Sequence, residues 1–320
     1  MQRIAVIGSG PAGYTAAIYA ARAGYDVIVY SGINPGGQLM ITTDVENYPG
    51  FADPIMGPDL MLAMEQQVKR VGATIITQTV THLNNSLFAA DQKWYVEDDR
   101  GPESSQVFDA VILATGATAN WLGIPGEQEL MGAGVSGCAT CDGFFFRNKT
   151  VAVIGGGDTA MEEATYLAKL CSKVYLVHRR EEFRASKAML ERARATANIE
   201  FLTPFTPVSI KGEGKVTHLE VISSPPLELN HALVGCYAIA VDGVFVAIGH
   251  KPQSDLVKHL NILDEHGYVI TKPGTSYTSV PGLFACGDVA DPVYRQAITS
   301  AGTGCVAAMD AQHWLQSLQS

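Results

Sequence analysis

The sequence predicts an α/β protein with two similar units, and two observations lead to that prediction. A buried strand at residues 4–7 runs into the glycine-rich turn Gly8-Ser9-Gly10-Pro11-Ala12-Gly13, then into a helical segment and a second strand at 26–30. The same pattern returns later, where a strand at 150–154 enters Gly155-Gly156-Gly157-Asp158-Thr159-Ala160. Gly8 aligns on Gly155 and Gly10 on Gly157, so the chain contains an internal repeat.

A strand, a G-x-G-x-x-G turn and a helix in this order are typical of a site for a dinucleotide. The glycines permit the tight turn, the close approach of a pyrophosphate and close helix–strand packing, and the helix N-terminus attracts the phosphate charge. The repeat therefore predicts two Rossmann-like, three-layer dinucleotide-binding domains. The candidate binding residues are Gly8, Gly10, Pro11, Ala12 and Gly13 in the first turn and Gly155, Gly157, Asp158, Thr159 and Ala160 in the second.

The strands that follow the two helices end differently. The first ends in Val29-Tyr30-Ser31, without the acidic residue that usually holds a ribose hydroxyl, so Ser31 or the backbone must take that role. The second ends in His178-Arg179-Arg180, with Arg184 close behind. Guanidinium groups suit a 2′-phosphate, so the second domain is predicted to bind NADPH rather than NADH.

The second domain is predicted to be inserted into the first. Residues 108–116 and 242–249 are similar buried strands that end in glycine, as though the chain left one domain after the first and returned to it after the second. We expect domains at 1–117, 118–245 and 246–320, joined by linkers near Ala117–Ala119 and Gly243–Ala247. Residues 73–96 alternate in places and are expected to form antiparallel strands.

Three further segments carry candidate ligand contacts. In the loop 32–50, adjacent Gly36 and Gly37 would let the backbone approach a bulky ligand. Asp288 ends a strand at 280–288 and could accept a hydrogen bond from a ligand hydroxyl. The helical pattern from Arg295 to Leu318 could direct its N-terminus toward electron-rich atoms of a cofactor.

The chain has one Cys-x-x-Cys, formed by Cys138 and Cys141. Alone, this pair could be redox-active, half of a metal site, or buried without chemical function. A zinc site would need a second Cys/His pair at ligand spacing, so no metal is predicted. The other four cysteines are expected to be reduced and buried. Asp142 follows the pair; as a carboxylate it would disfavour a neighbouring thiolate, whereas a protonated Asp142 could act as an acid/base for the dithiol.

Composition excludes several classes of function. The 320 residues carry a formal charge of −10, and no basic tract is present, which argues against nucleic acid as a partner. No apolar run is long enough for a membrane span. The start of the sequence has no pattern of a secretory leader, so we expect a cytoplasmic protein.

Taken in order, these motifs resemble the bacterial-type, low-molecular-weight thioredoxin reductases, flavoproteins of the pyridine nucleotide-disulfide oxidoreductase class II family. The resemblance covers essentially the whole chain. The motifs that carry it include Gly8 to Gly13, Gly36-Gly37-Gln38, Glu46 to Gly50, Ala114-Thr115-Gly116, Cys138 to Gly143, Gly155 to Ala160, His178-Arg179-Arg180 with Phe183-Arg184-Ala185, Gly287-Asp288 and Tyr294 to Ala297.

The resemblance implies FAD in the discontinuous domain, NADPH in the inserted one, a homodimer, and thioredoxin as the partner. Electrons would pass from NADPH through FAD to the Cys138–Cys141 disulfide, with Cys141 nearer the flavin and Asp142 as the acid/base. The implied FAD contacts, besides the first glycine turn, are Ser31, Gly36, Gly37, Gln38, Asn47, Thr115, Gly116, Asp288, Arg295, Gln296 and Ala297.

Three alternatives share parts of this pattern. A related flavin enzyme could reduce another small disulfide, or oxidise a dithiol with oxygen. A ferredoxin–NADP reductase of related fold lacks the dithiol, so Cys138 and Cys141 argue against it. A nicotinamide-sensing binding protein would have no use for the cysteine pair.

Overall fold

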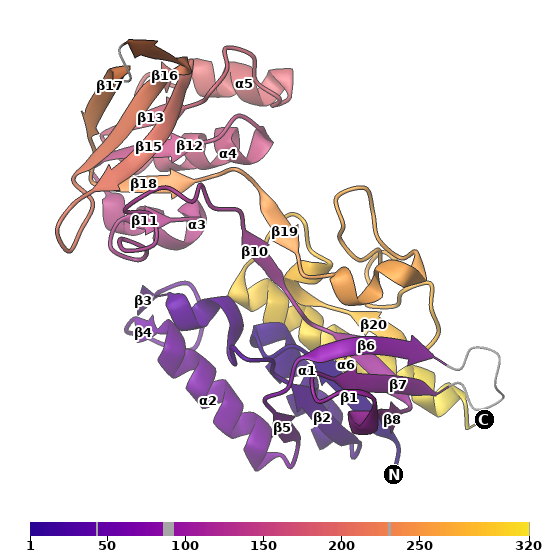
Figure 1. Ribbon diagram of the computed structural model, residues 1–320. Coiled ribbons are helices and arrows are strands. Elements are labelled where there is room, and N and C mark those ends of the chain that lie inside the picture. Colours follow the sequence, from indigo (N-terminus) through magenta and orange to yellow (C-terminus); the bar gives the residue numbers. More distant parts are fainter. Residues whose placement is uncertain (43, 86–92, 230–231, 320) are drawn as a thin grey trace. The chain divides into compact units, whose positions relative to one another are not determined.

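The computed structural model describes residues 1–42, 44–85, 93–229 and 232–319 and divides the chain into two compact units (Figure 1). The first unit comprises Met1–Thr118 and Lys251–Ser320, and the inserted unit comprises Ala119–His250. The segments that cross between them, β10 (Ala117–Ala119) and β19 (His250–Pro252), form a two-stranded sheet.

The predicted second linker, near Gly243–Ala247, is wrong. Residues Gly243–Val246 form β18, a buried strand between two neighbours of the inserted unit's sheet. A strand hydrogen-bonded on both sides cannot serve as a linker. The predicted boundary after residue 245 therefore falls inside β18, and the inserted unit continues to His250.

The first unit is built on a parallel sheet with strand order β20-β9-β1-β2-β5. Its central strands β1, β2 and β9 are mainly apolar and buried on both faces, as is typical of parallel sheets, whereas the edge strand β5 is partly exposed. Along β1 the side chains alternate: Ile4 and Val6 face one hydrophobic cluster, and Ala5 and Ile7 face the other. The strands are β1 (Arg3–Ile7), β2 (Asp26–Tyr30), β5 (Thr74–Ile76), β9 (Ala110–Leu113) and β20 (Leu283–Ala285).

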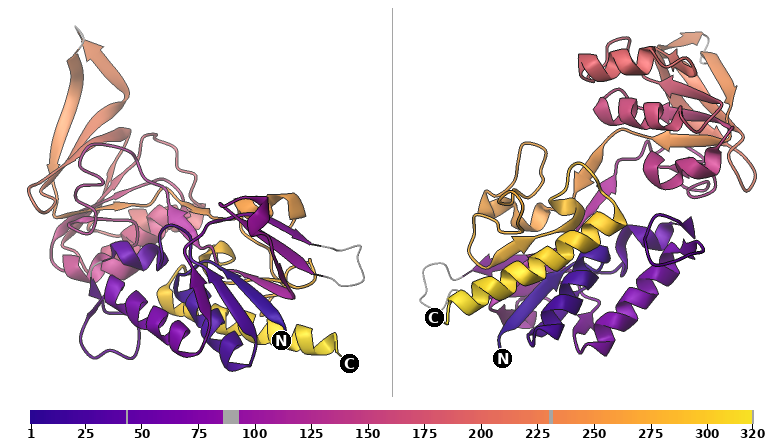
Figure 2. Two further views of the ribbon diagram at one scale, coloured as in Figure 1. Left: turned by 60° about the horizontal axis from the view of Figure 1, so that its bottom comes forward. Right: turned by 180° about the vertical axis from the view of Figure 1, so that it is seen from behind.

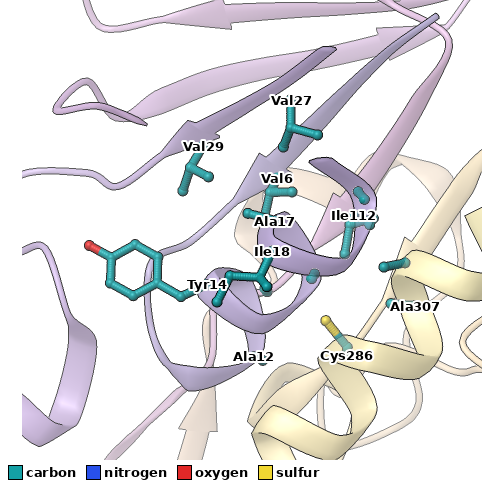
Figure 3. Close-up of a cluster of buried hydrophobic side chains, with 14 of the residues drawn as sticks. Val6, Ala12, Tyr14, Ala17, Ile18, Val27, Val29, Ile112, Cys286 and Ala307 are labelled. Atoms are coloured by element: carbon teal, nitrogen blue, oxygen red, sulfur yellow. The ribbon is translucent and has the colours of Figure 1, made fainter. Parts of the chain in front are cut away.

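Helices cover one face of this sheet, and an antiparallel sheet covers the other. Helices α1 (Pro11–Arg22), α2 (Gly57–Arg70) and α6 (Ala297–Ser317) pack on the cluster shown in Figure 3, where Ala17 and Ile18 of α1 lie beside sheet residues such as Val6. The antiparallel sheet contains β6 (Val80–Asn85), β7 (Trp94–Asp98) and β8 (Gln106–Phe108). The remaining elements are η1 (Gly37–Ile41), β3 (Asp44–Val45), β4 (Ile55–Met56), η2 (Pro102–Ser104), η4 (Asp255–Leu260) and η5 (Gly287–Val289).

The inserted unit repeats the three layers. Its parallel sheet has the order β11-β18-β12-β13-β14, with helices on one face and a three-stranded antiparallel sheet on the other (Figure 2). The parallel strands besides β18 are β11 (Val135–Ser136), β12 (Thr150–Ile154), β13 (Lys173–Val177) and β14 (Ile199–Leu202). The helices are α3 (Ala139–Asp142), η3 (Gly143–Phe146), α4 (Asp158–Leu167) and α5 (Lys187–Arg194). The antiparallel strands are β15 (Phe205–Lys211), β16 (His218–Leu229) and β17 (Ala232–Ala240).

The predicted α/β architecture of two three-layer units is therefore confirmed. Residues 73–96 supply the antiparallel strands β6 and β7, as expected, although residues 86–92 lie outside the described ranges. Thr74–Ile76 within this range departs from the expectation, because it pairs in parallel with β2. Across the described ranges, none of the helices combines the length and the hydropathy of a membrane span.

Candidate active site

Cys138 and Cys141 form a disulfide in the inserted unit. Cys138 caps α3, a single helical turn, and its Sγ accepts a hydrogen bond from the backbone N–H of Cys141 at 3.2 Å. Residues three apart lie on one face of a helical turn. The turn thus brings the two Cα atoms to 5.3 Å, a separation that a disulfide can span. Both cysteines are partly exposed, so another molecule's disulfide can approach them.

The carboxyl of Asp142 is held by Ser136 at the end of β11. The Ser136 hydroxyl lies 2.5 Å from Oδ2 of Asp142, and it also accepts the backbone N–H of Cys138 at 3.0 Å. Burial raises the pKa of Asp142, and the hydrogen bond from Ser136 partly opposes that shift. The protonated carboxyl is therefore more favoured than in water, which suits a group that donates a proton beside a thiolate.

The other cysteines differ from one another. Cys171 and Cys286 are buried, and burial raises the pKa of their thiols to about 11 and about 12. The expectation of burial is wrong for Cys236, which is exposed on β17 beside the exposed Tyr237, and for Cys305, which is partly exposed on α6 with its Sγ 3.9 Å from Sδ of the exposed Met309. In the part of the chain that is described, no three His, Cys, Asp or Glu side chains gather as a metal site would require.

The first glycine turn contains two kinds of glycine. A Cβ at Gly8 would lie 2.1 Å from the carbonyl oxygen of Ala114, and one at Gly13 would lie 2.0 Å from the carbonyl oxygen of Gly8. These two glycines are required by the fold itself. Gly10 has a φ of −70°, and a Cβ there would meet no protein atom within 4 Å. Neither backbone strain nor packing demands glycine at residue 10, and the space beside it is open.

The second turn also contains one glycine that the fold requires and one that lies beside open space. A Cβ at Gly155 would lie 2.3 Å from the carbonyl oxygen of Ala247, whereas one at Gly157 would meet nothing within 4 Å, at a φ of −103°. Ala160 takes the place of the third glycine. The carboxylate of Asp158 already has a partner within the protein, since its Oδ1 accepts a hydrogen bond from the backbone N–H of Ser186 at 2.7 Å. Thr159 is partly buried in the first turn of α4.

Ser9 joins three segments of the first unit, a role that its sequence neighbours do not reveal. Its buried hydroxyl donates to the carbonyl oxygen of Ser31 at 3.2 Å and accepts the backbone N–H of Gly36 at 3.0 Å. A Cβ at Gly37 would lie 3.4 Å from Cα of Gly10. Ser31, Gly36 and Gly37 are thus gathered around the first glycine turn, and Gln38 follows Gly37 in η1. The only local signal for Ser9 was its position inside the motif.

Asp288 lies in η5, a short helical turn of the first unit. Burial raises the pKa of Asp288, and the Ser300 hydroxyl donates to its Oδ1 at 2.8 Å. A Cβ at the preceding Gly287 would lie 2.8 Å from Cβ of Ala12. This contact brings Asp288 next to the first glycine turn, as a shared ligand site requires.

The loop before α6 is shaped by Asp291. Its carboxylate accepts the backbone N–H groups of Val293 and Tyr294, both at 2.9 Å, and of Arg295 at 3.2 Å. Arg295 has a φ of 48°, a left-handed conformation that is uncommon outside glycine. Gln296 then caps α6, which begins at Ala297, and its Oε1 accepts from Nδ2 of Asn47 at 3.4 Å.

Thr115 and Gly116 connect the end of β9 to the returning chain. The Thr115 hydroxyl donates to the carbonyl oxygen of Gln253 at 2.6 Å, and the backbone N–H of Gln253 donates to Gly116 at 2.9 Å. These two residues therefore join both halves of the discontinuous unit.

A basic strip follows β13 in the inserted unit. Arg179, Arg180 and Arg184 are exposed, and the backbone N–H of Arg184 donates to the carbonyl oxygen of Gly156 at 2.9 Å. The strip is therefore fixed beside the second glycine turn. Partial burial lowers the pKa of His178 and the three guanidinium charges add to that shift, while the hydrogen bond to the carbonyl oxygen of Glu182 opposes it.

The structure thus gathers the predicted residues into two groups. The first glycine turn, the loop 31–38, Asp288 and the start of α6 lie in the first unit. The second glycine turn, the basic strip and the disulfide with Asp142 lie in the inserted unit.

Comparison with known proteins gives consistent matches. Residues 2–304 match the family model described as pyridine nucleotide-disulphide oxidoreductase. A thioredoxin reductase of Mycolicibacterium smegmatis is 50% identical over 312 residues, which cover 98% of this chain and 96% of the relative. A thioredoxin reductase of Rickettsia conorii is 45% identical over 316 residues, which cover 98% of this chain and 98% of the relative. The solved thioredoxin reductase of Giardia duodenalis superposes with a TM-score of 0.89 at 40% identity, over 99% of this chain and 100% of that one.

Proposed function

The chain belongs to the pyridine nucleotide-disulphide oxidoreductase family, and from this membership we propose that it is an NADPH-dependent thioredoxin-disulfide reductase that uses FAD. The observation that carries the proposal is the Cys138–Cys141 disulfide, held in the same unit as the second glycine turn and the basic strip. A nucleotide site and an accessible disulfide in one unit suit a protein that transfers reducing equivalents outward.

FAD is assigned to the first unit and NADPH to the inserted unit. The open space beside Gly10 and beside Gly157 fits a pyrophosphate at each turn. In the first unit, Asp288 and the loop around Gly36 would hold the rest of the FAD. In the inserted unit, the exposed arginines at 179, 180 and 184 would hold the 2′-phosphate of NADPH. When bound, FAD supplies to the disulfide the two electrons that arrive from NADPH as a hydride.

The cysteine pair then passes these electrons to the partner by exchange. Uptake of two electrons and two protons opens the Cys138–Cys141 bond and leaves two thiols. One thiol gives up its proton and attacks, as a thiolate, the disulfide of thioredoxin; this forms a mixed disulfide and releases one thioredoxin thiolate, which takes up a proton. The second cysteine attacks the mixed disulfide, closes the Cys138–Cys141 bond and releases reduced thioredoxin. Asp142 is assigned as the group that donates and takes back a proton beside the pair.

A homodimer and a cytoplasmic location are also proposed. Both rest on the resemblance of the chain to the thioredoxin reductases. Light scattering of the purified protein at micromolar concentration tests the first, and a mass near that of a single chain would contradict it.

The test of the function is NADPH-dependent disulfide reduction by the purified protein, with and without thioredoxin. We expect a yellow protein whose colour NADPH bleaches, and turnover that requires thioredoxin. Reduction of a small aromatic disulfide at the same rate without thioredoxin would favour a reductase of small disulfides, and oxygen consumption with added dithiols would favour a dithiol oxidase.

Cysteine variants separate an enzyme from a sensor. Cys141→Ser should abolish thioredoxin reduction while NADPH still bleaches the flavin. Cys236→Ser is the matched control, because Cys236 is an exposed cysteine outside the pair, and this variant should keep full activity. Thioredoxin reduction by Cys141→Ser would contradict the dithiol route.

A further inference from the structure

Ser136 has more hydrogen-bond contacts than its single proton can satisfy at once. Its Oγ lies 2.5 Å from Oδ2 of Asp142 and 3.4 Å from the carbonyl oxygen of Cys138, and both contacts need the Ser136 proton if neither partner brings one. The backbone N–H of Cys138 donates to the same oxygen at 3.0 Å. A hydroxyl has one proton and two lone pairs, so it must choose between the two acceptors.

The choice depends on the charge of Asp142. When Asp142 is a carboxylate, its oxygen has no proton, and the strongest arrangement is a charge-assisted bond from Ser136 to Asp142. When Asp142 is protonated, its own O–H can donate to Ser136, and the Ser136 proton is then free to turn to the carbonyl of Cys138. The geometry accommodates both arrangements without movement of a heavy atom.

From this geometry we propose that Ser136 is a positioning residue whose hydroxyl reverses direction as Asp142 gains and loses its proton, and so holds Asp142 at the cysteine pair in both states. The inference rests on the proposed function, because it gives the Asp142 proton a role in thiol–disulfide exchange. The balanced step is transfer of one proton from a cysteine thiol to the Asp142 carboxylate, which leaves an attacking thiolate and a protonated carboxyl, while the Ser136 O–H turns from that carboxyl to the carbonyl oxygen of Cys138.

Burial makes the bond from Ser136 to the Asp142 carboxylate necessary. A carboxylate in a partly buried site is costly unless hydrogen bonds compensate the charge. Burial raises the pKa of Asp142, and the Ser136 bond is the opposing cause. Helix α4 packs against α3, and the segment after η3 carries further charges, but none of these side chains contributes to the shift. The titratable side chains on these elements are Asp158, Glu162, Glu163, Tyr166, Arg147 and Lys149.

The fold fixes Ser136 independently of the cysteine pair. Ser136 is the last residue of β11, is 6% exposed, and is aligned with Phe245 of β18 in the parallel sheet. The hydroxyl is therefore presented by the sheet, whereas Asp142 and Cys138 lie on the short turn of α3. A rigid strand thus orients a group on a one-turn helix, as precise positioning requires.

The test is the pH dependence of a single exchange. The FAD-loaded enzyme is reduced chemically with a dithiol, freed of reductant, and mixed with oxidised thioredoxin between pH 5 and pH 9. In a plot of exchange rate against pH, one limb is assigned to the titration of Asp142. Ser136→Ala should move the midpoint of this limb upward by about one to two pH units, because a charge-assisted bond to the carboxylate is lost. Ser136→Thr keeps the hydroxyl and should restore the wild-type profile.

Two comparisons make the result decisive. Ser209→Ala is the matched control, because Ser209 is also buried in the inserted unit and donates to a carboxylate, that of Glu220. Its profile should match the wild type. Asp142→Asn removes the group that titrates, so adding Ser136→Ala to this variant should cause no further change in the pH profile.

The outcomes distinguish the two proposals. A wild-type enzyme that fails to reduce thioredoxin overturns the proposed function. An active wild type in which Ser136→Ala and Ser209→Ala give the same unshifted limb overturns the role of Ser136. Intact flavin absorbance and re-formation of the Cys138–Cys141 disulfide in Ser136→Ala show that the variant is folded, so a shifted limb then supports the proposal.

Discussion

Substitution of Gly157 by alanine tests most directly whether glycine is needed there for the fold or for the ligand. A Cβ at this position meets no protein atom within 4 Å, and its φ of −103° is open to any residue. Alanine restricts the unfolded chain, which stabilises the fold by about 0.4–1 kcal/mol, while the weaker N-cap preference of alanine acts in the opposite direction by a similar amount. The net change in unfolding free energy should therefore stay within about 1 kcal/mol.

The affinity of the Gly157→Ala variant for NADPH should fall, although its stability hardly changes. If the pyrophosphate of NADPH occupies the space beside Gly157, one added methyl group must displace it. Excess volume of that size in a filled site costs about 1–3 kcal/mol, which corresponds to binding weaker by about 5- to 150-fold. NADPH titration of the oxidised enzyme measures the dissociation constant, and FAD content, which depends on the other unit, should be unchanged.

Two matched variants complete the experiment. Gly155→Ala places a Cβ 2.3 Å from the carbonyl oxygen of Ala247, so it should destabilise the inserted unit itself. Gly10→Ala should weaken FAD and leave NADPH binding to the inserted unit intact. If Gly157→Ala bound NADPH as tightly as the wild type, or unfolded as Gly155→Ala is expected to, the assignment of Gly157 to the ligand would be refuted.

Three further predictions follow from the charges and thiols. Changing Arg179 and Arg180 to glutamine should raise the KM for NADPH by about tenfold or more per lost guanidinium contact and leave that for NADH unchanged. The Arg100 side chain lowers the pKa of Asp98 from 3.8 to about 2, so the stability from this carboxylate is complete above pH 4 and is lost as the pH falls toward 2; Asp98→Asn should remove that dependence from denaturant midpoints measured between pH 2 and pH 5. Iodoacetamide at pH 8 should label Cys236, which is exposed, and spare Cys286, as peptide mass mapping can check.

Local chemistry explains why the two nucleotide units could be predicted from the sequence. A turn that needs glycine at Gly8 and Gly155 leaves a pattern that is readable without any distant contact, and the apolar strands before each turn have no other stable place than a buried parallel sheet. The cysteine pair was readable for the same reason, since one helical turn is enough to bring Cys138 to Cys141.

What the sequence did not predict depends on distant pairing. Residues 242–249 were predicted to be a buried strand, but their assignment to a linker fails because β18 pairs with β11 and β12, which lie far away in the sequence. Thr74–Ile76 is too short for its own pattern to decide between a parallel and an antiparallel partner. Ser136 lies within six residues of Asp142, but its hydroxyl points there because β11 pairs with β18, more than a hundred residues later. Side chains that act through tertiary placement leave no local signal.

The two kinds of glycine also give an argument for ligand binding that does not depend on relatives. A domain that had kept its fold but lost its dinucleotide would still require glycine at Gly8 and Gly155, because backbone carbonyl groups occupy the space of a side chain there. It would have no such need at Gly10 or Gly157, where the protein leaves the space open. A side chain at either position would cost the protein itself little, so glycine there is consistent with the proposed pyrophosphate sites. Since both units show this feature, each unit has its own reason to be assigned a bound phosphate.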